Sequence, residues 1–129
     1  VRRCSKEYVL KHRYKAIVLL ALLPASVHAR TFTAEASWYG KWHHGRTMAN
    51  GERFDMYDPT IAAHRTLPFG TQLWVTNPTT NVSQVVVVRD RGPYTDNPRR
   101  TLDLSKAAAD RLGFTEDGVA SLKIRIISP

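Results

Sequence analysis

Residues 82–93 read VSQVVVVRDRGP, four consecutive valines followed by a polar turn. A short apolar run of β-branched residues is typical of a strand, and its unbroken hydrophobicity predicts that both faces of that strand are buried. The Gly-Pro pair that follows ends the run and turns the chain. The sequence therefore predicts a central buried strand, with Asp90 at the point where this strand ends.

Other segments carry further strand patterns. Residues 34–39 mix small and aromatic side chains before a glycine, and residues 73–76 form an apolar run closed by an Asn-Pro pair, which predicts a core position for Trp74. In residues 121–126 apolar and polar side chains alternate, as expected for a strand with one buried face. The residues expected to point inward there are Leu122, Ile124 and Ile126.

One short helix is predicted between these strands. Ser105 is a suitable N-cap, residues 106–112 are rich in alanine, and Gly113 is placed to end the helix. Many short strands with one or two short helices in a domain of about 100 residues predict a mainly β fold, a small closed barrel.

Composition limits the possible classes of protein. The chain of 129 residues corresponds to one domain, and its 43% hydrophobic and 23% charged residues exclude a disordered or collagen-like chain. The formal charge of +8 invites a nucleic-acid interpretation, but residues 1–29 hold six Lys and Arg against one Glu. Residues 30–129 hold 13 bases and 10 acids, so no nucleic-acid partner is expected for them.

Residues 1–29 have the pattern of a secretory signal peptide. A basic stretch precedes an apolar run of 12 residues, 16–27, and the small residue Ala29 offers a cleavage site. The run is shorter than the roughly 20 residues that cross a bilayer. A retained membrane anchor and a buried core helix are the alternatives. Cys4, the only cysteine, precedes the apolar run, so we expect no lipid anchor.

Cleavage would leave residues 30–129 as a domain without cysteine. We expect this domain to be secreted across the inner membrane, to act in the periplasm or outside the cell, and to be a monomer without a stable membrane anchor.

Four ionisable side chains are candidates for catalysis: Glu52, Asp55, His64 and Asp90. The first two lie in the polar segment 41–60, which is long for a simple connection. Breaking a glycosidic bond requires an acid for the leaving oxygen and a negative group beside the developing sugar cation, and carboxylates supply both. The alternative is structural: the acids would be solvated or fix turns, and the histidine would be a hydrogen-bonded structural residue.

Candidates for substrate binding lie in the loops. Trp42 and Tyr94 are aromatic residues suited to stacking on sugar rings, and Arg91 belongs to a basic cluster that suits an anionic polymer or solvent. His43 and His44 are adjacent and cannot easily share one ion, and no spaced ligand set or phosphate loop is present. We therefore expect no metal and no cofactor.

Several ordered stretches resemble the rare lipoprotein A family of septal lytic transglycosylases. They are ASWYG (36–40), HGRT (44–47), ANGERFDM (49–56), AAHRTLPFGT (62–71), VRDRGPY (88–94) and LDLS (102–105). The resemblance covers nearly all of residues 34–127. It implies a six-stranded double-psi β-barrel, shared more distantly with expansins. It also implies endolytic cleavage of peptidoglycan strands, preferably those without stem peptides, to leave 1,6-anhydro-N-acetylmuramic acid ends.

The resemblance also implies roles for residues. The family's active-site positions fall on the four catalytic candidates, with Asp90, or as a second choice Asp55, as general acid/base. Glu52 and the other aspartate would stabilise the cationic sugar, and His64 would orient a carboxylate or bind the N-acetyl group. Asp103 corresponds to a catalytic aspartate of expansin-type barrels and is a fifth candidate. The expected substrate-binding residues are Asp103, Trp42, Tyr94 and Arg91.

Some features depart from the family pattern. The span from Asp55 to His64 is one residue longer than usual, and neither a lipid-attachment cysteine nor a C-terminal peptidoglycan-binding domain is found. We therefore expect a minimal single-domain member whose partner is the peptidoglycan glycan strand. The alternative function is a non-catalytic, expansin-like module that binds the wall polymer without cutting it.

Overall fold

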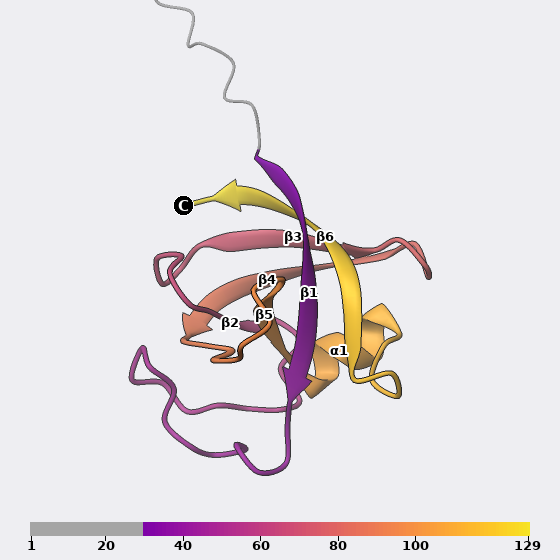
Figure 1. The fold of residues 1–129 in the computed structure, drawn as a ribbon. Helices are drawn as coiled ribbons and strands as arrows, with labels where there is room; N and C mark the ends of the chain where they lie inside the picture. Colours follow the sequence, from indigo (N-terminus) through magenta and orange to yellow (C-terminus); the bar gives the residue numbers. More distant parts are fainter. Residues whose placement is uncertain (1–29) are drawn as a thin grey trace, which may run out of the picture.

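The structure, a computed structural model, describes residues 30–129; the expected signal peptide lies outside the described residues. Within this range six strands close into a barrel, as predicted, in the order β1-β5-β2-β4-β3-β6 (Figure 1). The elements are β1 (Thr31–Tyr39), β2 (Ile61–His64), β3 (Gln72–Asn77), β4 (Val82–Asp90), β5 (Arg100–Ser105), α1 (Lys106–Leu112) and β6 (Val119–Ser128). No helix among residues 30–129 is long and apolar enough to cross a membrane.

The valine strand β4 lies inside the sheet but is fully buried on one face only. Val86 and Val88 are inaccessible to solvent, whereas Val85 and Val87 are half-buried. The prediction of two buried faces is wrong because only the inward face of a closed barrel meets the core. β4 pairs in parallel with β2 and antiparallel with β3, so every strand contributes alternate residues to one core.

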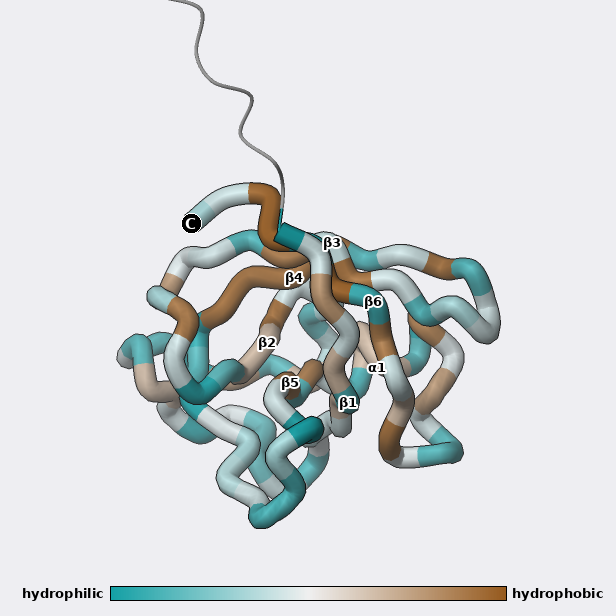
Figure 2. The backbone as a smooth tube through the Cα atoms, turned by 45° about the horizontal axis from the view of Figure 1, so that its top comes forward, coloured by the Kyte–Doolittle hydropathy of each residue, from teal (hydrophilic) through white to brown (hydrophobic). Residues whose placement is uncertain are grey.

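The alternation predicted for residues 121–126 is confirmed. Leu122 and Ile124 are buried and Ile126 packs against the core, while the polar residues between them are exposed. Figure 2 shows hydrophobic stretches along β4 and β6 and hydrophilic residues in the connecting loops.

Trp74 does not lie in the core. Its neighbours Leu73 and Val75 are fully buried, so the alternation of β3 turns the indole outward, where it is 41% exposed. The guanidinium of Arg125 lies 5.8 Å from the ring centroid. The prediction of a core position was wrong because it considered only the apolar character of Trp74 and not the alternation of inward and outward side chains along a strand.

Two short strands, β2 and β5, had no clear pattern in the sequence. Each lies between two partners: β2 between β4 and β5, and β5 between β1 and β2. Their residues therefore gain most of their strand character from neighbouring strands rather than from local preference.

The predicted caps of α1 are confirmed. Ser105 Oγ accepts a hydrogen bond from the Ala108 N–H at 3.2 Å, and Gly113 adopts a φ of 81°, a left-handed conformation that glycine favours. Ser105 Oγ also donates to the Asp58 carbonyl at 2.6 Å. One hydroxyl therefore caps the helix and holds the end of the long loop 40–60 against it.

Replacing Ser105 by Ala should lower the free energy of unfolding by about 1–2 kcal/mol, since both the cap and the loop contact are lost. Chemical denaturation measures this change. Ser121→Ala, at an exposed position of β6, is the matched control and should change stability by less than about 0.5 kcal/mol. Equal stability of both variants would show that the Ser105 hydroxyl does not hold the loop.

Candidate active site

Four residues form a row across four neighbouring strands. Ser37 of β1 pairs with Asp103 of β5, Asp103 pairs with Ala63 of β2, and Ala63 pairs with Asp90 of β4. The residues on either side of Asp103, Leu102 and Leu104, belong to the core. Because successive side chains of a strand alternate, the row lies on the outer face of the barrel.

An irregularity in the pairing of β2 with β4 brings Asp90 into this row. Ala62 pairs with Val88, but the next pair is Ala63 with Asp90, so Arg89 is the extra residue. Such bulges redirect side chains and are frequent beside active sites. One strand separates Asp90 from Asp103, which places their Cα atoms roughly 10 Å apart. We call Asp90 and Asp103 the carboxylate pair.

Asp90 is held by three donors. Its Oδ1 accepts the backbone N–H groups of Ala49 and Arg91, both at 2.9 Å, and its Oδ2 accepts the Tyr39 hydroxyl at 3.3 Å. The expected turn-forming role is therefore present. The turn uses only Oδ1, because Oδ2 contacts the Tyr39 side chain instead of the backbone.

Asp103 lies in a partly buried environment. Ser37 Oγ, itself buried, donates to its Oδ1 at 2.6 Å, and Arg100 Nε donates to Ser37 Oγ at 2.8 Å. Burial is the largest influence and raises the pKa of Asp103, with Asp90 adding to the rise, while Ser37, Arg100 and His43 oppose it. Asp103 therefore holds its proton to a higher pH than an ordinary aspartate.

Tyr39 donates to Asp90 and lies within the electrostatic influence of Asp103. It follows Ser37 by two residues on β1 and so lies on the same face. Burial, together with the charges of Asp90 and Asp103, raises its pKa, so the hydroxyl stays protonated and can donate. The ring stacks on Phe54 at 4.1 Å between centroids and meets His43 edge-on.

The two loop acids lie further out. Glu52 is mostly exposed, and one of its oxygens is 3.9 Å from Arg89 Nη1, next to Asp90 in the chain. Asp55 accepts the Tyr57 N–H at 2.9 Å and is 3.9 Å from His44 Nδ1, which is the turn-forming role considered above. Of these two acids, only Glu52 therefore contacts a residue of β4, the strand that carries Asp90.

His64 lies on the other face of β2. It pairs with Leu102 and follows Ala63, so alternation directs it away from the carboxylate pair. Its Nδ1 accepts the N–H groups of Thr66 and Leu67, each at 3.1 Å. Burial, with Arg91 and Arg65 nearby, lowers the pKa of His64. The imidazole is therefore neutral at pH 7, and its proton is on Nε2.

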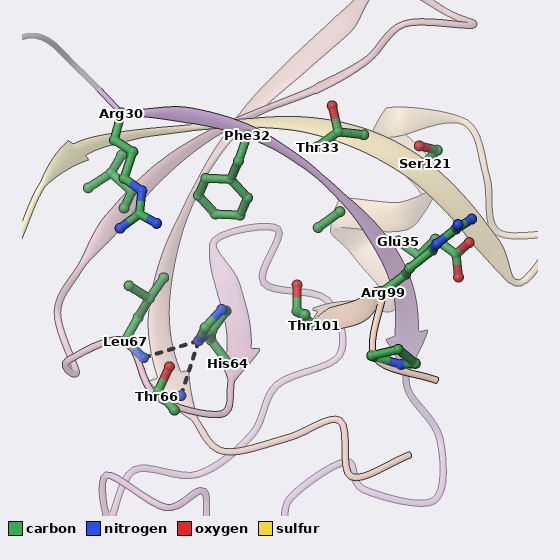
Figure 3. A pocket seen from close by; sticks show the side chains of 13 residues that line it. Arg30, Phe32, Thr33, Glu35, His64, Thr66, Leu67, Arg99, Thr101 and Ser121 are labelled. Carbon is green, nitrogen blue, oxygen red and sulfur yellow. Dashed lines mark hydrogen bonds between the residues drawn. The ribbon is translucent and has the colours of Figure 1, made fainter. Parts of the chain in front are cut away.

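His64 lines a cavity of about 650 Å³. Figure 3 shows this cavity between the first half of β1 and the segment that follows β2. β1 pairs with β5 only from Glu35 onward, which leaves the side of the barrel open at this point.

The expected substrate-binding residues are dispersed. Arg91 Nη1 donates to the carbonyls of Leu67 and His64, at 2.9 and 3.2 Å, and its guanidinium lies 3.9 Å from the Phe69 ring centroid. It therefore holds the segment after β2. Trp42 and Tyr94 are 81% and 79% exposed, as expected for loop aromatics available to a ligand.

Sequence reasoning did not select Ser37 as a site residue, and it considered Tyr39 and Arg100 only as members of an aromatic set and a basic cluster. Ser37 and Tyr39 lie in a quoted family stretch and alternate on one strand, which was the only available signal. The contacts of Ser37 depend on the pairing of β1 with β5, 63 or more residues apart along the chain, and that of Tyr39 joins β1 to Asp90, 51 residues later. Among the described residues no group of three or more His, Cys, Asp or Glu is placed to hold a metal ion.

Comparison with known proteins gives consistent results. Residues 31–124 match the family described as lytic transglycolase, a double-psi β-barrel domain. The chain is 50% identical over 99 residues to the endolytic peptidoglycan transglycosylase RlpA of Neisseria meningitidis, covering 77% of this chain and 40% of that protein. It is 48% identical over 94 residues to the RlpA of Pseudomonas aeruginosa, covering 73% and 27%. The chain thus spans less than half the length of these relatives.

Solved structures share the fold at lower identity. The Streptomyces papain inhibitor has a TM-score of 0.59 and 23% identity, covering 77% of this chain and 96% of its own. A mutant expansin of Clavibacter michiganensis in complex with cellohexaose has a TM-score of 0.55 and 23% identity, covering 78% and 52%. The expansin-like barrel predicted from the sequence is therefore confirmed.

The raised pKa of Asp103 leads to a prediction about stability. In the unfolded chain an aspartate has a pKa near 3.9. Because the folded-state pKa is higher, the native protein loses stability as pH rises from about 4 through that value. Asp103→Asn removes this loss, so the variant should be more stable than the native protein at pH 7, and the gain should shrink below about pH 4.

Urea unfolding midpoints between pH 3.5 and pH 8 measure this difference. Asp117→Asn, at an exposed position, is the matched control and should show no comparable gain. A variant of Asp103 that is less stable than the native protein at pH 7 would contradict the assignment of a costly buried charge.

Proposed function

Since this chain belongs to the lytic transglycolase family of double-psi β-barrels, we propose that it cleaves the glycan strands of peptidoglycan endolytically, as a transglycosylase. The observation that carries the proposal is the carboxylate pair on the outer face, in which Tyr39 donates a hydrogen bond to Asp90 and Ser37 donates one to Asp103.

The reaction requires one group that acts first as acid and then as base. A proton passes to the glycosidic oxygen, the bond from this oxygen to the anomeric carbon breaks, and the sugar develops positive charge. The C6 hydroxyl of the same N-acetylmuramic acid then attacks the anomeric carbon and returns a proton to the protein. A 1,6-anhydro ring forms and no water is consumed.

Asp103 is suited to the acid/base role. Its raised pKa keeps a proton available for the leaving oxygen, and burial favours its reprotonation by the C6 hydroxyl. Ser37 and Arg100 hold it in one orientation. The resemblance implied Asp90, or as a second choice Asp55, for this role and gave Asp103 as a fifth candidate; the raised pKa of Asp103 favours Asp103 instead.

Asp90 is suited to stabilising the sugar cation. The Asp90 carboxylate accepts all three of its hydrogen bonds, so it acts as an acceptor. The Tyr39 hydroxyl is one of the donors and orients the carboxylate. Glu52, held near Arg89 beside it, adds negative charge to the same end of the face. Asp55 has a turn-forming role in the loop and is the weaker candidate for direct catalysis.

We place the substrate along the outer face, with the exposed rings of Trp42 and Tyr94 stacking on sugars away from the cleavage point. Strands without stem peptides are the preferred substrate because they approach a barrel face without steric obstruction. Action on this polymer requires export from the cytoplasm, and we propose that the domain acts in the periplasm or outside the cell as a monomer without a stable membrane anchor.

The test is mass spectrometry of peptidoglycan digested with the purified protein, using intact and amidase-treated sacculi. Products ending in 1,6-anhydro-N-acetylmuramic acid support the proposal, and reducing ends would change the reaction to hydrolysis. Binding to sacculi without any soluble product would favour the wall-binding module instead.

Asp103→Asn should lower kcat by about 10²–10⁴-fold, because the proton transfer is lost. Asp90→Asn should also lower kcat but should leave the basic limb of the pH–rate profile in place, since Asp103 still titrates. Glu116→Gln, at an exposed position, is the control and should retain full activity. If instead Asp90→Asn removes that limb and Asp103→Asn does not, Asp90 is the acid.

Tyr39→Phe keeps the stacking on Phe54 but loses the hydroxyl that reaches Asp90. We expect kcat to fall about tenfold with little change in KM, because a hydrogen bond to a charged group contributes roughly 1.5 kcal/mol or more. Tyr57→Phe, at an exposed tyrosine of the loop that carries Phe54, is the matched control. A change in KM alone would indicate that Tyr39 binds substrate rather than positioning Asp90.

A further inference from the structure

The cavity beside His64 has the composition of a ligand site, although it lies on the other face of β2 from the carboxylate pair. Arg30, which directly precedes β1, and Phe32 of β1 extend into it, and Thr101 of β5 and His64 of β2 line its opposite side (Figure 3). With a volume of about 650 Å³ it lies within the range typical of small-ligand pockets.

His64 provides a directed donor in this cavity. Its Nδ1 accepts two backbone N–H groups, so the neutral ring has its proton on Nε2. Nε2 makes no hydrogen bond to any residue of the described chain. A neutral donor of fixed direction suits a carbonyl oxygen, such as that of an acetamido group.

The other lining groups define the rest of the ligand. The half-buried Phe32 offers an apolar ring face, on which a sugar ring can pack. Arg30 and Arg99 bring two guanidinium groups, and neither forms an ion pair within residues 30–129. The one acid, Glu35, accepts a hydrogen bond from Asn97 Nδ2 at 2.8 Å. The cavity therefore has an excess of positive charge.

We propose that this cavity binds an N-acetylmuramic acid unit whose lactyl carboxylate is free. His64 Nε2 donates to the acetamido carbonyl, Phe32 packs on the ring, and Arg30 and Arg99 pair with the carboxylate. This inference rests on the proposed function and deepens it. Removal of a stem peptide uncovers the lactyl carboxylate, so the cavity would select stripped strands by charge and not only by size.

The position of the cavity fits one continuous strand of sugars. His64 enters the cavity from the face of β2 opposite the carboxylate pair, but Glu35 and Thr101, which also line it, precede Ser37 and Asp103 by two residues on β1 and β5, where the pairing of these strands is irregular. The cavity therefore borders the outer face at the β1–β5 edge. Two residues of a strand span roughly 7 Å. A glycan could therefore extend from the carboxylate pair to the cavity, which would hold a sugar next to the cleaved bond.

The decisive test uses soluble glycan strands freed of peptides, with the lactyl carboxylates either free or neutralised as amides. Arg99→Gln and Arg30→Gln should each raise KM about tenfold on the free-carboxylate strands, with kcat nearly unchanged. Neither substitution should alter KM on the amidated strands. Arg111→Gln removes the same charge from α1, outside the cavity, and should change neither constant.

His64 is a poor residue to replace, because its Nδ1 also holds the Thr66 and Leu67 N–H groups. The direct measurement is therefore an NMR titration of the native protein, following the His64 ring signals. N-acetylmuramic acid should shift these signals at lower concentration than N-acetylglucosamine, which lacks the carboxylate. Arg99→Gln should reduce this difference.

The outcomes separate this inference from the proposed function. If the native protein cleaves strands but the arginine variants keep their KM, or both sugars bind equally, the cavity assignment is wrong while the activity stands. If no strand is cleaved but N-acetylmuramic acid selectively shifts His64, the enzyme proposal fails and the carboxylate-selective sugar site stands.

Discussion

The pairing of Ala63 with Asp103 on one side and Asp90 on the other is the constraint on which the site depends. β2 has only four residues, yet it separates the two carboxylates and presents a small side chain between them. A slip of one residue would turn every side chain of β2 to the opposite face and place the His64 imidazole between the acids. The register is held because Ala62 and its neighbours in β4 and β5 fill the core.

This register has an energetic consequence for the acids. Asp103 is partly withdrawn from water and lies near a second carboxylate, so its charge is unfavourable in the folded state. The groups around it are placed to control that charge rather than to neutralise it: Ser37 donates one hydrogen bond, and Arg100 acts through Ser37. A direct ion pair with Arg100 would favour the charged form and remove the proton that an acid catalyst needs. The indirect arrangement thus serves chemistry at a cost in stability.

Sequence patterns predicted those parts of the fold that depend on local rules. The caps of α1, the alternation in β6 and the barrel itself follow from side-chain period and capping preference. The failures have two origins, long-range pairing and a neglected local alternation. β2 and β5 are strands because of their neighbours, and the outward turn of Trp74 depends on the phase of β3. Asp90 was recognised from its motif, but its contact with Tyr39, 51 residues earlier, required the closed barrel.

The same alternation gives β2 two chemical faces. Ala63 allows the carboxylate pair to lie across it on the outer face, and His64, the next residue, faces the cavity with a neutral ring. A histidine beside catalytic acids would be expected to exchange protons with them, but His64 accepts two backbone N–H groups and has only a donor left to offer. Its chemistry is therefore that of recognition. A strand of four residues can in this way separate proton transfer from substrate selection, because adjacent residues never share a face.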